Sequence, residues 1–121
     1  MMHNFRDLEV WIKSIKLCKI FYLASNNFPK DEIFGLTSQS RRSLYSIPSN
    51  IAEGAGRDTD AQFSHFLNIA LGSSFEFETQ ILIANDLGFF KNDDFNIIYS
   101  EIKHIQNMLA KLKQKFNTQA F

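Results

Sequence analysis

The sequence has little of what interrupts or cross-links a chain: one cysteine, two prolines and five glycines among 121 residues. A single cysteine, Cys18, excludes an intramolecular disulfide framework and any zinc site built from several cysteines, which favours a reducing, cytoplasmic setting. So few turn-forming residues leave little room for the many turns of an all-β sandwich. No apolar run approaches the roughly 18 residues that span a bilayer, so we expect a soluble protein without membrane contact.

The chain also has a formal net charge of zero, because 13 basic residues balance 13 acidic ones. This balance argues against a strongly basic nucleic-acid binder. The charges are nevertheless segregated along the chain. Residues 1–57 carry eight basic and five acidic side chains, residues 58–101 one and eight, and residues 102–121 four and none, which gives +3, −7 and +4.

What the sequence does contain is 45% hydrophobic residues, including 13 phenylalanines, at helical spacing. The pattern predicts a single domain over residues 1–121 with four long helices. The first helix is expected from an N-cap at Asp7 to about Asn26, and the second from near Leu36 to the glycines of EGAG at 53–56. The third is expected from an N-cap at Asp58 or Thr59 to Leu87-Gly88, and the fourth from after Asn92 to about Phe116. Pro48 lies inside the second helix, where it removes a backbone donor, so we expect a kink there.

Each expected helix has an apolar stripe, and four such helices with short connections favour an all-α fold, the antiparallel up-and-down four-helix bundle. In the first helix the stripe reads Leu8, Trp11, Ile12, Ile15, Cys18, Phe21 and Tyr22. The third helix has a second apolar set besides its core stripe: Ile69, Leu71, Phe75, Leu82 and Ile83. A helix that is apolar on most sides must also be covered from outside the bundle. We therefore expect oligomerisation.

Signals of catalysis or of metal binding are weak. His3, His65 and His104 are far apart and have no second ligand at a metal-binding spacing. Cys18 lies on an apolar helix face, as a buried structural cysteine does. The sequence contains no nucleophile elbow and no nucleotide-binding glycine loop. We expect no catalytic residue, no metal, no cofactor and no enzymatic activity.

Two interpretations apply to the polar residues of the second helix and its surroundings. In the first, Arg41, Arg42 and Arg57 form a phosphate-contacting patch for RNA or DNA. In the second, these arginines are structural and belong to a polar network that holds the second helix against the third. The candidate members of that network are Ser46, Asn50, Glu53, Glu76 and Glu78.

The segment FGLTSQSRRSLYSIPSNIAEGAGR at 34–57, followed by FSHFLNIALGSSFEFETQILIANDLG at 63–88, resembles the four-helix-bundle family encoded by intervening sequences in bacterial large-subunit ribosomal RNA genes. The opening LEVWIKSIKLCKIFY and the late NMLAKL are similar to that family as well, so the resemblance covers nearly the whole chain. It implies a subunit of a ring-like homopentamer. A related branch serves as the accessory protein of diversity-generating retroelements, where it binds nucleic acid and a reverse transcriptase. The matching positions are Arg41, Arg42, Ser46, Pro48, Asn50, Glu53, Gly54, Arg57 and Glu78.

The sequence thus supports two hypotheses from different classes. The leading one is a non-enzymatic homopentameric adaptor that associates with RNA or DNA weakly and in a salt-sensitive manner. The alternative is an oligomeric protein-interaction module without nucleic-acid contact, whose protein partner the sequence does not identify. Solvent-facing arginines on one face would favour the first hypothesis, and arginines paired to Glu53, Glu76 or Glu78 would favour the second.

Overall fold

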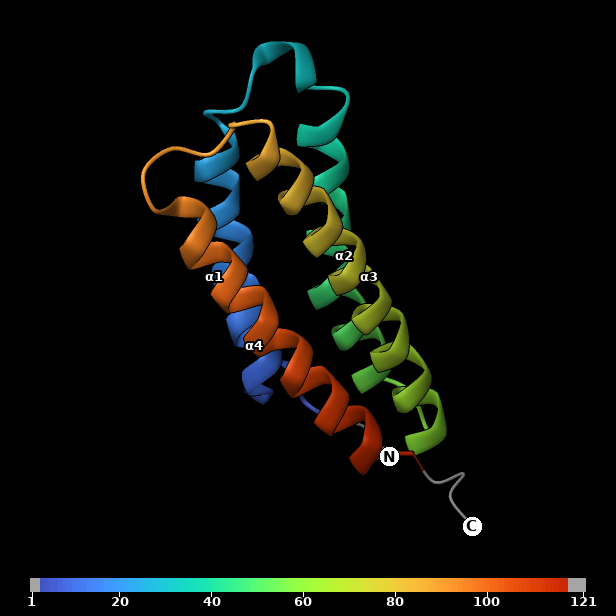
Figure 1. The fold of residues 1–121 in the computed structure, drawn as a ribbon. Helices are drawn as coiled ribbons and strands as arrows, with labels where there is room; N and C mark the ends of the chain where they lie inside the picture. The colour runs from blue at the N-terminus through green and yellow to red at the C-terminus, as the bar shows by residue number, and fades with distance from the viewer. Residues whose placement is uncertain (1–2, 118–121) are drawn as a thin grey trace.

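A computed structural model describes residues 3–117 of the chain. It contains four long helices, α1 (Glu9–Ser25), α2 (Leu36–Ala55), α3 (Asp60–Asp86) and α4 (Asp94–Lys115). Two short 3-10 turns, η1 (Phe5–Asp7) and η2 (Lys30–Glu32), precede α1 and α2. The described residues include no strand. The helices run alternately up and down, which confirms the predicted all-α four-helix bundle (Figure 1).

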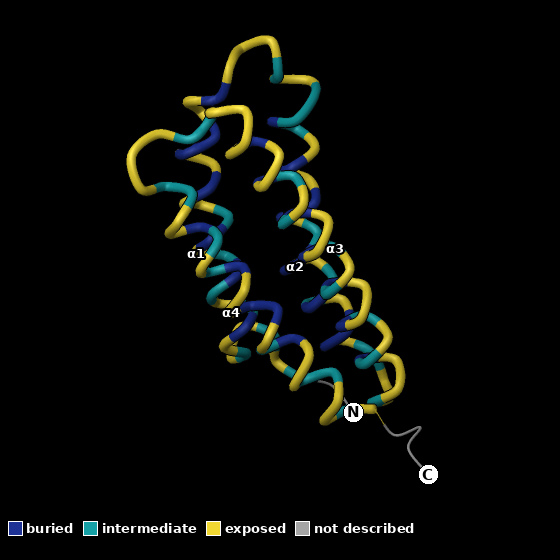
Figure 2. The backbone as a smooth tube through the Cα atoms, viewed as in Figure 1, coloured by how far each residue is buried: buried dark blue, intermediate teal, exposed yellow. Residues whose placement is uncertain are grey.

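The helices surround one hydrophobic core in the order α1, α2, α3, α4, and α4 packs back against α1. Figure 2 shows the buried residues on the inward sides of all four helices. The largest fully buried side chains are Leu17, Phe21, Leu44, Ile47, Ile51, Phe63, Leu67, Phe77, Ile81, Ile98, Ile102 and Ile105. Near the loops that join α1 to α2 and α3 to α4, aromatic rings close this core, with Phe28 5.6 Å from Phe89 and 5.1 Å from Phe90 between ring centroids.

The beginning of α1 differs from the sequence prediction. Asp7 is not the N-cap, because Phe5–Asp7 form the turn η1, which Asn4 caps by accepting a hydrogen bond from the Arg6 amide at 3.1 Å. Leu8 is the N-cap of α1 and makes no side-chain capping bond. The beginning of α3, by contrast, follows the prediction, because Thr59 and Gln62 form a reciprocal capping box.

The inward face of α1 was also predicted wrongly in part. Ile12 and Tyr22 are 39% and 49% exposed, whereas Val10 and Leu17 belong to the core. Since α1 carries apolar residues on several sides, helical spacing alone does not select the side that faces the bundle. In α2, α3 and α4 the predicted stripes supply most of the buried residues.

Helix α2 is continuous through Pro48, and the kink expected there stays a prediction. Side chains next to the proline form local hydrogen bonds. The Asn50 amide donates to the Ser46 carbonyl at 2.8 Å and to Ser46 Oγ at 2.9 Å, and Ser49 Oγ donates to the Tyr45 carbonyl at 2.9 Å. All three bonds lie in the turns next to Pro48, which has no N–H group to donate.

Candidate functional site

Arg41 joins the start of α2 to the end of α1. Its Nε donates to Ser25 Oγ at 2.8 Å, and its Nη2 donates to the Tyr22 carbonyl and to Asn26 Oδ1, both at 3.1 Å. The guanidinium also lies 4.4 Å from the centre of the Tyr22 ring. A cation at the carboxyl end of a helix complements the helix dipole and satisfies carbonyls that lack an intrahelical partner. Arg41 therefore has a structural role, with partners that the sequence did not suggest.

Arg57 is occupied as well. Its Nη2 donates to Glu53 Oε2 at 2.8 Å, one helical turn earlier, and its guanidinium lies 4.8 Å from the centre of the Phe66 ring of α3. Both charged side chains are about half exposed, so the ion pair is screened by water and contributes little stability. The pair shows one of the arrangements that the structural interpretation expects, an arginine bound to Glu53.

Arg42 is exposed and makes no ion pair or hydrogen bond within residues 3–117. It lies beside an open groove of about 600 Å³ on the outer side of α2. Arg57 lies beyond the end of α2, and the helix from Arg42 to Ala55 alone has a length of about 20 Å. The three arginines therefore do not converge on one phosphate-sized site, and Arg42 is the member that remains available to a partner.

The five residues predicted as one polar network fall into separate groups. Ser46 and Asn50 bond to each other, and Ser46 Oγ lies 2.9 Å from Ser73 Oγ of α3. Glu53 forms its ion pair with Arg57, at the exposed end of α2. Glu76 accepts a hydrogen bond from Gln80 at 3.4 Å, and Gln80 in turn accepts one from Ser43 at 2.6 Å. A serine and glutamine contact between α2 and α3 thus takes the place of the predicted ionic one.

Glu78 faces α4 rather than α2. Its carboxylate accepts hydrogen bonds from Gln106 Nε2 at 2.8 Å, Tyr99 OH at 3.2 Å and Lys103 Nζ at 3.4 Å. These donors, the Gln106 amide first, lower the pKa of the Glu78 carboxyl group below its usual value of 4.5. Gln106 also donates to the Ser74 carbonyl at 3.4 Å. This cluster fixes α3 against α4, because it joins Glu78 to three side chains of α4.

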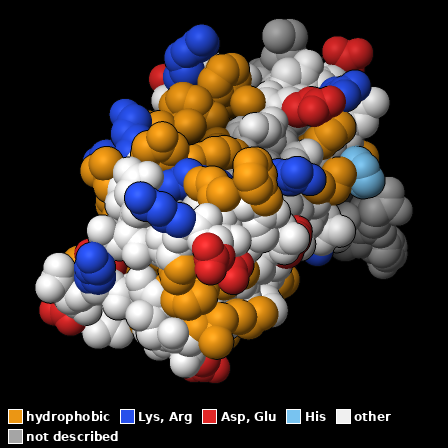
Figure 3. Space-filling model, turned by 90° about the horizontal axis from the view of Figure 1, so that it is seen from above, with side chains coloured by type: hydrophobic (Ala, Val, Ile, Leu, Met, Phe, Trp, Pro, Cys, Tyr) orange, Lys and Arg blue, Asp and Glu red, His pale blue; other side chains and the backbone are white. Residues whose placement is uncertain are grey.

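The outer sides of α1 and α2 carry two adjoining grooves. One, of about 390 Å³, is lined by Cys18, Lys19, Tyr22, Leu23 and Tyr45. The other is the 600 Å³ groove beside Arg42, which shares Tyr45 with the first and is bordered by Phe34, 91% exposed. Seen from above, the molecule carries patches of hydrophobic side chains on its surface with Lys and Arg side chains beside them (Figure 3). Such a surface suits contact with another macromolecule better than the enclosure of a small molecule.

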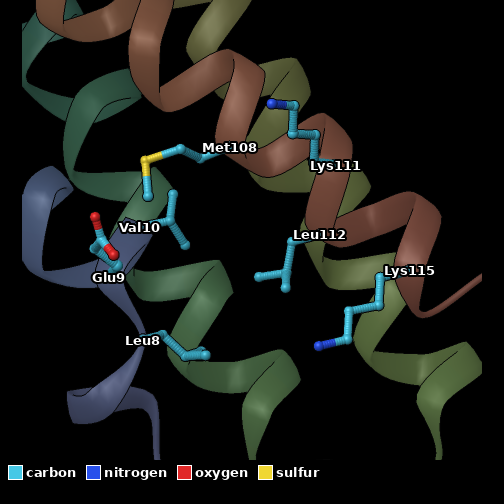
Figure 4. Close-up of a pocket in the computed structure, with 7 residues that line it drawn as sticks. All are labelled: Leu8, Glu9, Val10, Met108, Lys111, Leu112 and Lys115. Atoms are coloured by element: carbon cyan, nitrogen blue, oxygen red, sulfur yellow. The ribbon is translucent and has the colours of Figure 1, made fainter.

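A further groove, of about 310 Å³, lies between the beginning of α1 and the end of α4. Met108 and Leu112 reach from α4 toward Val10 and Leu8, and Glu9, Lys111 and Lys115 lie at its rim (Figure 4). Its lining is mainly apolar, and it holds no histidine or cysteine.

The candidate chemical groups elsewhere do not converge. Burial raises the pKa of the Cys18 thiol to about 12, so this thiol is a poor nucleophile. The centroid of the His3 ring lies 4.9 Å from that of Phe63 and 5.0 Å from that of Phe116, and its Nε2 lies 3.9 Å from Asp60 Oδ1. Within residues 3–117, no three histidine, cysteine, aspartate or glutamate side chains are placed to hold a metal ion. None of the described helices is long and apolar enough to cross a membrane.

Comparison with known proteins identifies the family. The model of the 23S rRNA-intervening sequence protein family matches residues 6–111. The chain belongs to this family. A solved structure from Bacteroides thetaiotaomicron VPI-5482, a protein of unknown function from the S23 ribosomal protein family, superposes with a TM-score of 0.78 at 24% identity, covering 87% of this chain and 98% of that one. No curated protein matches the sequence.

The family match includes all of α2 and α3, and the geometry explains several of the positions that carry the resemblance. Arg41 closes the end of α1, and Glu78 fixes α3 to α4. Gly54 lies where α2 meets α3, because a Cβ at this position would stand 2.6 Å from the Phe66 Cβ. These three positions of the intervening-sequence protein pattern thus serve the fold, whereas Arg42 makes no ion pair or hydrogen bond within residues 3–117.

Proposed function

We propose that this chain is the non-enzymatic subunit of a cytoplasmic homo-oligomer. The observation that carries the proposal is the number of large apolar side chains that the isolated bundle leaves in water. Those that are at least 38% exposed are Ile12, Ile20, Tyr22, Leu23, Ile33, Phe34, Tyr45, Ile69, Phe75, Leu82, Ile83, Leu87 and Ile97. Five of them, Tyr22, Leu23, Ile33, Phe34 and Tyr45, line the two adjoining grooves of α1 and α2. A monomer rarely exposes large contiguous apolar patches, and their burial between subunits is favourable.

The resemblance described above favours a pentamer as the form of this assembly. Light scattering coupled to size-exclusion chromatography tests it directly, and the expected mass is about five times the 14.0 kDa of one chain. A single-chain mass at micromolar concentration would refute the homo-oligomer. A dimer or tetramer would retain the oligomer and refute the pentamer.

The non-enzymatic part of the proposal is supported by the character of the grooves. The three grooves described above are open and mainly apolar, and none of them is lined by a histidine or a carboxylate together with a serine or a cysteine. The strongest pKa perturbation of a nucleophile, at Cys18, makes it less reactive instead of more reactive. These open apolar grooves suit contact with another protein surface.

A second candidate function, association with RNA or DNA, is favoured by Arg42 and by the basic end of α4. Arg42 has no partner among the described residues, and Lys111, Lys113 and Lys115 lie in the last two turns of α4. An assembly would repeat these few charges in every subunit, which raises the avidity of a weak site. The family's printed name refers to 23S ribosomal RNA, but it does not state what the protein binds.

Fluorescence anisotropy with labelled RNA and DNA across a salt series tests this second function. We expect weak binding at low salt whose logarithm falls linearly with the logarithm of the salt concentration. The variants to compare are Arg42→Ala and a combined Lys111→Ala, Lys113→Ala, Lys115→Ala form. Arg41→Ala is unsuitable because Arg41 holds α1 to α2. Absence of binding by the wild type at low salt would refute the nucleic-acid function and leave the oligomer untouched.

A further inference from the structure

The outer side of α3 carries a regular stripe that no part of the subunit covers. Its members follow one another at alternating steps of three and four residues: Ile69, Gly72, Glu76, Thr79, Ile83 and Asp86. All six are exposed, and Figure 2 shows the exposed side of α3 turned away from the bundle. We call these residues the α3 stripe. This spacing is the one by which a helix contacts a second helix along its length.

Gly72 is the unusual member of the α3 stripe. It lies in the middle of a 27-residue helix, and a Cβ built on it would meet no atom within 4 Å. Glycine inside a helix is destabilising relative to alanine, and the cost is normally tolerated where another group approaches the backbone closely. At Gly54 that group is Phe66. At Gly72 the subunit provides no such group, and the backbone is open to close approach by a second molecule.

The outer side of α2 carries the complementary charge. Its groove is lined by three small hydroxyl residues, Ser38, Ser46 and Ser49, together with the larger side chains of Ile33, Phe34, Arg41, Arg42 and Tyr45. Small residues on one helix allow the backbone of another helix to come near. Arg42 contributes a positive charge without an internal partner, and Lys19 of α1 adds a second one beside the adjoining groove.

The α3 stripe and the α2 groove also carry charges of opposite sign. Helix α3 contains no lysine or arginine, and its stripe contains Glu76 and Asp86. Of these, Glu76 has one long hydrogen bond, 3.4 Å from the neutral Gln80 amide, and it has no ion pair within the described chain. A negative apolar stripe and a positive groove on one molecule attract each other between copies.

We propose that the α3 stripe of one copy lies in the α2 groove of a second copy, with Gly72 at the closest approach and Arg42 against Glu76. The inference rests on the proposed homo-oligomer and names its contact. Because the two surfaces differ, the contact is head-to-tail, and it generates a ring when the rotation between neighbours closes. The partner of this surface is therefore a second copy of the chain.

The first test adds one methyl group at the closest approach. In Gly72→Ala the methyl group occupies space that the isolated subunit leaves open, so the subunit should unfold at the same or a higher temperature when it is dissociated by dilution. The dissociation constant of the assembly, measured by analytical ultracentrifugation, should rise about tenfold or more. Gly72→Leu should abolish assembly. Asn107→Ala, on the exposed side of α4, is the matched control and should leave the mass unchanged.

The second test reverses charges across the proposed contact. Arg42→Glu and Glu76→Lys should each raise the dissociation constant, and the double variant should recover most of the loss, because it restores an opposite pair between copies. Assembly that is unaffected by Gly72→Leu, or a double variant that is weaker than both single ones, would overturn this contact while the oligomer stands. A monomeric wild-type protein would overturn the oligomer itself.

Discussion

Gly54 gives the sharpest test of how closely α2 and α3 pack. A Cβ at this position would lie 2.6 Å from the Phe66 Cβ and 3.0 Å from Phe63 Cδ1. Carbon atoms in contact prefer about 3.5–4.0 Å, so Gly54→Ala requires the two helices to separate by roughly 1 Å. Overpacking of this kind costs about 1–3 kcal/mol. Replacing a glycine inside a helix by alanine returns up to about 1 kcal/mol. The nearest atom is a Cβ, which does not move without its backbone, so we expect a cost in the upper half of that range and a net destabilisation of about 1–2 kcal/mol.

Thermal unfolding followed by circular dichroism at one fixed protein concentration measures this effect, and the expected fall in Tm is on the order of 5 °C. Gly56→Ala is the matched control. Its Cβ would meet nothing nearer than the Glu53 carbonyl oxygen at 3.7 Å, and its φ of −86° suits any residue. The control should be neutral or slightly stabilising. If Gly54→Ala were as stable as Gly56→Ala, the close approach of α2 and α3 would be refuted.

Three further predictions concern single side chains. The pKa of Glu78 is lowered in the folded protein, so its contribution to stability is complete above the unfolded value of 4.5 and is lost as the pH falls below it. The free energies of unfolding of wild type and Glu78→Gln, measured by chemical denaturation, should therefore differ less at pH 3 than at pH 6. Arg41→Ala should lower the free energy of unfolding by about 1–3 kcal/mol in urea titrations, with little recovery in Arg41→Lys, because an ammonium group does not reproduce the guanidinium fork. Cys18 should react with iodoacetamide at pH 8 at least about a hundredfold more slowly in the folded protein than in denaturant. Equal rates in the two states would contradict the burial of this thiol.

The sequence was sufficient to predict the four helices because the core positions of α2, α3 and α4 repeat at steps of three and four residues. Ile98, Ile102, Ile105 and Leu109 are fully buried as the spacing implies, and the second apolar set of α3 places Phe75 and Leu82 in water. In α1, where apolar residues occur around the helix, the same spacing includes the exposed Ile12 and Tyr22 together with the buried Phe21. Spacing identifies a buried face only when the opposite face is polar.

The roles of the polar residues depended on contacts that spacing within one helix does not reveal. Arg41 bonds to Ser25, 16 residues earlier, because antiparallel packing places the start of α2 beside the end of α1. That contact could have been anticipated from the register of the hairpin. Glu78 and Gln106 are 28 residues apart on antiparallel helices, and which of several polar residues meet there depends on the rotation of each helix. Ser46 bonds to Asn50 and reaches Ser73 of α3, whereas Glu78 bonds to side chains of α4, so the five candidate residues do not form one network.

The contact proposed for Arg42 also decides where nucleic acid would bind. If Arg42 lies against α3 of a second copy, it is unavailable to phosphate, and the basic residues left on the assembled surface include Lys111, Lys113 and Lys115 of α4. We therefore expect the lysine variant, and not Arg42→Ala, to reduce the salt dependence of RNA binding at concentrations where the protein is assembled. Each lost phosphate contact should lower the slope of log K against log salt by roughly 0.7–0.9. An Arg42→Ala protein that remains assembled but has a reduced slope would show that Arg42 contacts phosphate, and it would thereby contradict the assignment of Arg42 to the interface between copies.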